Sequence, residues 1–293
     1  MAKPLLSTDS KASIEPEGLY YSIESQSVED SCIPSSISHG NTHNNNIHAS
    51  QPASDWTFTN VGEVPAFSRD GSPHATDEVF NSASHLAASM FSILGTALLV
   101  SEASYQGAPW KIVSFSIYGG SLIFLFVCST LHHSVSSTPW VEERLRMLDY
   151  LAIYPLIAGT FTPMCLVFYH DSPIGWCFCG VVWALAIGGM FMTVRLFTKM
   201  PKWMSMTMYI TLGWIGAFMA KWLIPVLGYA GMGLFLFGGV LYTVGGVVYT
   251  SEKPNPIPGK FGFHEIWHVM VMAGALTHYL MVYFFILPWG NVP

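Results

Sequence analysis

The stretch His264–Pro288, HEIWHVMVMAGALTHYLMVYFFILP, decides the fold of this chain. It is 25 residues long, and its only charged side chain is Glu265. A helix needs about 20 mostly apolar residues to cross the hydrocarbon core of a bilayer, which is about 30 Å thick. Backbone groups in lipid must be paired within their own segment, so an apolar run of this length is expected to be helical. We therefore predict a transmembrane helix here.

Two histidines open the stretch. His264 and His268 are four residues apart and therefore share a helix face, which makes them a pair of potential metal ligands. The alternative is that both are interfacial polar residues. The spacing with Glu265 also matches the metalloprotease motif, in which Glu265 would be the base. That class usually takes a third ligand from a later Asp, and none follows Asp171. We therefore disfavour a protease and expect Glu265 to face the interface or a neighbouring helix.

Six further apolar runs precede this one. The chain of 293 residues is 51% hydrophobic and only 10% charged, whereas a soluble domain has about 25% charged residues. This composition argues for a membrane protein. We predict an all-α membrane protein, a seven-transmembrane helix bundle whose loops are too short to hold a soluble domain. The predicted spans are 83–104, 110–132, 149–169, 173–194, 203–223, 227–250 and 264–288.

The first 75 residues differ in character from the rest. They are rich in Ser, Asn, Pro and acidic residues, and they show no helical or strand period. Residues 1–79 hold 11 acidic and 3 basic residues, in a chain whose net charge is −6. We predict a disordered acidic tail over 1–75, with cytoplasmic partners, and a membrane domain over 76–293. The acidity belongs to the tail, so it says nothing about the charge of a substrate.

Loop charges predict the orientation. The loops that follow the second, fourth and sixth spans carry the basic residues Arg144, Arg146, Arg195, Lys199, Lys202, Lys253 and Lys260. The alternate loops carry only Lys111 and Lys221, near their ends. Basic loops stay on the cytoplasmic side, so we expect a cytoplasmic N-terminus and an outer C-terminus. Seven spans, an odd number, also place the two ends of the chain on opposite sides of the membrane.

Polar side chains from three predicted spans reach the cytoplasmic side. Ser129 and His133 end the second span, Asp149 opens the third, and His264 and His268 open the seventh. Such residues in a membrane segment are candidates for function. The three imidazoles make a three-nitrogen site suited to zinc. Zinc with three protein ligands keeps a fourth position for water, which is typical of a catalytic site.

The two remaining residues have predicted catalytic roles. Asp149 would hold and deprotonate the water, whose pKa zinc lowers to about 7. Ser129 lies one turn before His133 and would brace that ligand or contact an oxyanion. The alternatives are that Asp149 is a helix N-cap and that Ser129 bonds to its own helix.

Three other histidines are assigned different places. His132 points about 100° away from His133, so only one of them can face the site, and we choose His133 because it shares a face with Ser129. His278 lies roughly 15 Å deeper than His268, which favours a hydrogen-bonded interhelical role. His85, with Glu78 and Asn81 just before it, adds polar groups at the start of the first span.

Together these residues resemble the hemolysin III family, which is joined with the progestin and adipoQ receptors. The resemblance covers about 76–288, and the run Phe261–His268 is nearer to the hemolysin III branch. It implies a seven-helix bundle with one zinc ion near the cytoplasmic face, held by three histidines, with Asp149 and Ser129 around the bound water. The motifs that carry it are Glu78-x-x-Asn81-x-x-Ser84-His85, Ser129-x3-His133, Asp149, His264-x3-His268 and His278.

The resemblance leaves several functions open. The family includes receptors, hemolysin-like proteins and relatives of alkaline ceramidases, which hydrolyse lipid amides. Our first hypothesis is a zinc-dependent, ceramidase-like hydrolase linked to signalling, and the second is a receptor or regulator with a structural zinc. A pore is disfavoured because no span shows a charged ring or a polar face. We expect a multi-pass protein of the plasma membrane or the Golgi/ER. Its expected partner is a membrane lipid or a lipid-like ligand. We do not expect it to bind nucleic acid.

Overall fold

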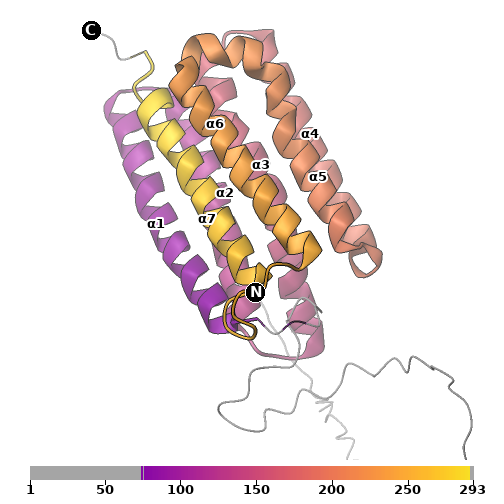
Figure 1. Ribbon diagram of the computed structural model, residues 1–293. Coiled ribbons are helices and arrows are strands. Elements are labelled where there is room, and N and C mark those ends of the chain that lie inside the picture. The colour runs from indigo at the N-terminus through magenta and orange to yellow at the C-terminus, as the bar shows by residue number, and fades with distance from the viewer. Residues whose placement is uncertain (1–73, 75, 291–293) are drawn as a thin grey trace, which may run out of the picture. The chain divides into compact units, whose positions relative to one another are not determined.

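Helices make up almost all of the computed structural model, which describes His74 and residues 76–290 (Figure 1). The predicted tail, 1–75, lies outside the described residues except for His74. Within the described residues the elements are α1 Glu78–Tyr105, α2 Pro109–Ser134, α3 Pro139–Tyr169, α4 Pro173–Leu196, the 3-10 turn η1 Phe197–Lys199, α5 Lys202–Trp214, the 3-10 turn η2 Ile215–Met219, α6 Ala220–Ser251, α7 Phe263–Met281 and the π-helical turn η3 Val282–Ile286.

The chain is a multi-pass membrane protein, as predicted. Within the described part, six segments are long and apolar enough to cross a bilayer. One of them, Lys202–Ser251, has 50 residues, about twice the length that one crossing needs. Gly228 inside this segment has φ 65° and ψ 175°, a conformation that is open almost only to glycine. The chain turns back between α5 and the later part of α6 (Figure 1). The break at Gly228 follows the predicted span 203–223 and falls at the start of the predicted span 227–250.

Helix α3 begins earlier than the predicted third span. It starts at Pro139, with Thr138 at the N-cap position, whereas the prediction placed the start of the span at Asp149. Proline suits the first position of a helix because its fixed φ is already helical and the N–H that it lacks would have no partner there. The charged residues after Pro139 lower the hydropathy without ending the helix. The N-cap alternative for Asp149 is therefore wrong, because Asp149 lies inside α3.

Helix α3 forms the centre of the bundle. Of its most apolar window, 78% is buried inside the protein, compared with 22–56% for the other candidate spans. Helix α2 packs mainly against α1 and α3, while α3 also packs against α4, and α7 packs mainly against α6. The outer helices and the turn η2 keep large apolar side chains exposed, among them Phe91, Ile187 and Phe218. These side chains suit a surface in contact with lipid.

Small residues allow α6 and α7 to approach closely. A Cβ added at Gly238 would collide with the ring of His278, and one added at Gly274 would meet the ring of Tyr242 at 2.8 Å. Glycine at a helix contact lets the backbones come together, and packing of this kind stabilises helix pairs in lipid. The position of α7, which carries the two histidines of the opening motif, therefore depends on these glycines.

We predict that Gly238→Ala destabilises the bundle by about 1–3 kcal/mol, the usual cost of overpacking a tight contact. The measurement is the midpoint of thermal unfolding of the purified protein in detergent. Gly233→Ala is the matched control, because a Cβ at Gly233 in the same helix would meet no atom within 4 Å. An equal midpoint in both variants would show that the contact between Gly238 and His278 does not limit the approach of α6 and α7.

Candidate metal centre

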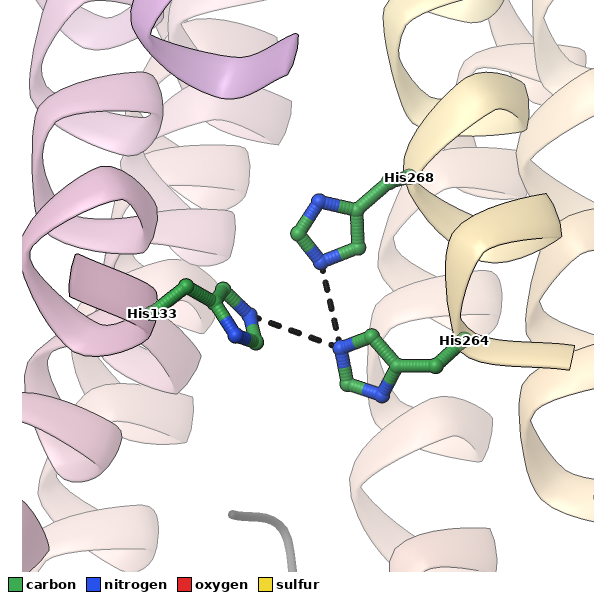
Figure 2. Close-up of side chains that lie close together, drawn as sticks. All are labelled: His133, His264 and His268. Carbon is green, nitrogen blue, oxygen red and sulfur yellow. Dashed lines mark hydrogen bonds between the residues drawn. The ribbon is translucent and has the colours of Figure 1, made fainter. Parts of the chain in front are cut away.

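Three imidazole rings converge between α2 and α7 (Figure 2). His133 comes from the last turn of α2, and His264 and His268 come from the first turns of α7. The Nε2 atom of His264 lies 3.4 Å from Nε2 of His133 and 3.1 Å from Nε2 of His268. All three residues are buried, with 2–3% of their surface exposed. The structure thus brings together the three histidines that the sequence singled out.

These distances fit a shared metal ion. Zinc binds histidine nitrogens at about 2.0–2.1 Å in tetrahedral geometry, which places two such nitrogens about 3.3 Å apart. Nε2 of His264 cannot form a full hydrogen bond with both neighbouring rings at once, because it has either one hydrogen or one lone pair to share between them. A cation that accepts a lone pair from each ring satisfies all three. The triad of His133, His264 and His268 can therefore hold a metal ion.

A carboxylate orients the ligand from α2. Oε2 of Glu78 lies 2.6 Å from Nδ1 of His133, and Oε1 of Glu78 accepts a hydrogen bond of 2.8 Å from Thr76. A carboxylate at Nδ1 fixes the tautomer that leaves Nε2 unprotonated, and it makes the ring a better ligand. The sequence had suggested Glu78 only as a polar group at the start of the first span. The available signal was an acidic side chain in the first turn of an apolar helix, where it needs a partner.

A stacked ring holds another ligand in place. The His85 ring of α1 lies on the His268 ring, with centroids 3.9 Å apart and an angle of 30° between the planes. His85 is 3% exposed. Helix α1 therefore contributes a support to each side of the cluster, Glu78 against His133 and His85 against His268. The sequence placed His85 in this region without giving it a role.

Asp149 lies beside the cluster. An oxygen of Asp149 and one ring nitrogen each from His132 and His133 all lie within 4.8 Å of one another. His133 thus belongs both to this group and to the triad, while His132 belongs only to the group with Asp149. Ser129 is 2% exposed and lies one turn before His133 on α2. The catalytic roles of Asp149 and Ser129 stay predictions.

Glu265 has a structural position. One of its oxygens accepts a hydrogen bond of 2.7 Å from the Gly262 N–H, which caps α7. The other accepts hydrogen bonds from the Asp77 N–H at 2.6 Å and from Nδ2 of Asn81 at 3.3 Å. These bonds join the beginnings of α1 and α7, as the prediction of a neighbouring helix implied. With both oxygens engaged in this way, Glu265 is not placed as the base of a metalloprotease.

His278 is an interhelical residue, as predicted. Its Nε2 atom lies 3.0 Å from the carbonyl oxygen of Phe235 in α6. The ring also stacks on Phe235, with centroids 5.6 Å apart. His278 is in neither of the two groups that can hold a metal within the described residues. It belongs to the contact between α6 and α7.

Comparison with known proteins identifies the family to which this chain is similar. The model of the family described as Haemolysin-III related matches residues 74–279. The chain is 36% identical to "Hemolysin-3" of Bacillus cereus over 215 residues, which are 73% of this chain and 94% of that protein. It is 34% identical to the "Hemolysin-3 homolog" of Bacillus subtilis (strain 168), over 71% of this chain and 94% of that protein. It is 27% identical to the human "Monocyte to macrophage differentiation factor", over 72% and 85% of the two chains.

We predict that Glu78→Ala weakens metal binding about 10- to 100-fold, the usual effect of removing the carboxylate behind a histidine ligand. The dissociation constant is measured on the purified full chain by competition with a chromophoric chelator. Glu102→Ala is the control, because Glu102 is an exposed acidic residue at the other end of α1. Equal constants for Glu78→Ala and wild type would remove Glu78 from the metal centre.

Proposed function

The chain belongs to the haemolysin-III-related family, and on that premise we propose that it is a zinc-containing membrane protein that hydrolyses a lipid amide, such as a ceramide. One observation carries this proposal. Three buried histidine nitrogens converge next to the carboxylate of Asp149, inside a bundle of membrane-spanning helices. A substrate held in the bilayer would reach such a site through its polar headgroup.

The ligand set favours zinc. Three neutral imidazoles suit a borderline-soft divalent ion, and a site with three protein ligands is the usual catalytic arrangement for zinc. When bound, zinc in such a site polarises a carbonyl group and lowers the pKa of water to about 7.

The residues around the triad then have distinct tasks. Asp149 accepts the proton of the attacking water and returns it to the amine that leaves when the amide C–N bond breaks. The Ser129 hydroxyl donates a hydrogen bond to the oxygen that becomes negative. Glu78 keeps the His133 ring turned toward the ion, through the bond of 2.6 Å to Nδ1.

A second candidate function is a receptor or regulator in which the ion only joins helices. The observation that favours it is the origin of the ligands. His133 belongs to α2, which packs mainly on α1 and α3, and the other two belong to α7, which packs mainly on α6. An ion held by both helices would bridge two parts of the bundle, and its binding energy would add to folding stability.

We also propose seven crossings, with the N-terminus in the cytoplasm, the C-terminus outside and the metal centre at the cytoplasmic end. The 50-residue segment Lys202–Ser251 would supply two crossings, separated at Gly228. The basic residues near the junctions of α2 with α3, of α4 with α5 and of α6 with α7 support this orientation.

The hydrolase and the receptor differ in what Asp149→Asn does. In the hydrolase, this variant keeps about one zinc per chain and most of its thermal stability, but it loses lipid-amide hydrolysis by about 100-fold or more, the effect of removing a general base. His133→Ala is expected to lose both zinc and stability, because it removes a ligand. The measurements are zinc content, the thermal midpoint and the release of fatty acid from a panel of lipid amides.

Asp171→Asn is the control for this experiment. Asp171 follows α3 at the opposite end from the metal centre, and its side chain is 91% exposed, so the variant is expected to behave as wild type. Wild-type protein with full zinc but no turnover of any amide in the panel would reject the hydrolase. A drop in stability of Asp149→Asn in that case would favour the role of the ion as a bridge.

The orientation is tested by labelling single cysteines with a membrane-impermeant thiol reagent. The background is a variant in which the five native cysteines are replaced. We predict that Ser137→Cys, in the exposed loop between α2 and α3, reacts only from the cytoplasmic side. Asn291→Cys is expected to react only from outside. The reverse pattern would place the metal centre at the outer face.

A further inference from the structure

A polar cavity lies at the same end of the bundle as the histidine triad. It has a volume of about 150 Å³ and is formed where α3, η1 and the start of α5 meet. Arg146 of α3 lines it, three residues before Asp149 and therefore about one turn away on the same helix. The residues that line it are Arg146, Tyr150, Phe197, Thr198, Met200, Lys202 and Ser205.

The cavity carries a positive charge that the described residues do not neutralise. The guanidinium of Arg146, which is half-buried, stacks on the ring of Phe197 at 5.1 Å, and no described carboxylate forms an ion pair with it. Lys202 does have a partner, because its Nζ lies 3.0 Å from Oε1 of Glu252. One positive charge therefore remains at the cavity wall. A partly buried guanidinium is stabilised by an anion that accepts its hydrogen bonds.

Further donors point to the same cavity. Ser205 is only 1% exposed, and its hydroxyl forms no hydrogen bond with another residue in the described part of the chain. Ser205 lies in the first turn of α5, which begins at Lys202 without a side-chain cap and without an acidic residue. The N-terminal end of a helix carries unpaired N–H groups and a partial positive charge, which attract anions. Arg146 of α3 and, from α5, Ser205 and the helix end thus surround one space.

We propose that this cavity binds a phosphate group, either as a phospholipid headgroup or as free phosphate. Phosphate presents several acceptor oxygens to the guanidinium, the ammonium and the hydroxyls of the wall at once, and arginine binds it with paired hydrogen bonds. The end of the bundle that holds this cavity is also suited to contact lipid headgroups. Trp140 and Trp203 are 65% and 59% exposed there, and exposed Trp side chains gather at the level of lipid headgroups.

The cavity is in contact with the metal centre through aromatic side chains. The hydroxyl of Tyr150, which lines the cavity, lies 2.7 Å from the hydroxyl of Tyr249 in α6. The Tyr249 ring packs against the ring of His264, with centroids 5.5 Å apart. A phosphate-bearing molecule in the cavity would therefore lie two side chains away from a predicted metal ligand. Its binding does not require the metal or any hydrolysis, so it can be tested separately.

The test uses the full chain, purified in a neutral maltoside detergent and freed of lipid. Dioctanoyl phosphatidic acid, inorganic phosphate and dioctanoylglycerol are added in turn, and the thermal midpoint gives the affinity, because a ligand that binds only the folded protein raises the midpoint. We expect at least one of the two phosphate compounds to stabilise wild type and dioctanoylglycerol to have no effect. Arg146→Gln should weaken the binding about tenfold or more, the effect of losing a charge-assisted hydrogen bond.

Arg144→Gln is the matched control. Arg144 lies two residues from Arg146 on α3, is exposed, stacks on Trp140 at 5.4 Å and does not line the cavity. This variant should bind as wild type does. Ser205→Ala changes the wall by one oxygen atom and should weaken the binding about threefold or more, which keeps the test informative if Arg146→Gln folds poorly. An unchanged thermal midpoint of each variant without added compound verifies the fold.

The compounds identify the source of the phosphate. Stabilisation by phosphatidic acid alone, dependent on Arg146, supports a headgroup site. Equal stabilisation by inorganic phosphate supports a site for free phosphate. The proposal is overturned if neither compound stabilises wild type, or if Arg144→Gln and Arg146→Gln weaken the binding equally, because the charge would then act only as part of the general surface.

Discussion

The meeting of the Nε2 atoms of His133, His264 and His268 is the interaction on which this architecture depends. Three imidazoles buried among membrane helices need partners, because neither lipid nor the apolar side chains supply any. Two side chains of α1 supply some of these partners. Glu78 bonds the His133 ring, and His85 stacks on the His268 ring. The beginnings of α1 and α7 and the end of α2 are therefore constrained together, at one end of the bundle.

This end of the bundle concentrates polar chemistry in an otherwise apolar protein. The histidine triad, the carboxylate of Asp149 and the cavity lined by Arg146 all lie there, while the outer helices expose many large apolar side chains. A lipid substrate or ligand has the same division between an apolar body and a polar end. The hydrolase and the receptor proposals share this geometry and differ only in whether Asp149 acts on a bound molecule. A phosphate in the cavity would place a lipid headgroup close to either kind of site.

Several of these features follow from the sequence because they depend on local spacing. Apolar runs longer than about 20 residues require helices in lipid, so the all-α membrane class follows directly. His264 and His268 share a face because a helix has 3.6 residues per turn. The same argument chose His133 over His132 for the triad, but it wrongly excluded His132 from the region, since one nitrogen of each ring lies within 4.8 Å of Asp149. The depth of His278 along its helix keeps it out of the cluster. Each inference uses one helix at a time.

What the sequence alone did not determine involves contacts between helices. The bond from Glu78 to His133 joins residues 55 positions apart, and the bonds of Glu265 to Asp77 and Asn81 span 188 and 184 positions. The hydropathy of the sequence also placed the start of α3 too late. Charged residues at a membrane surface can be as helical as the apolar residues that follow them. The sequence thus determined which elements form and which faces carry histidines. Only the tertiary structure decided which carboxylate supports a ligand and which caps a helix, since that choice depends on the neighbour that packing brings to each buried oxygen.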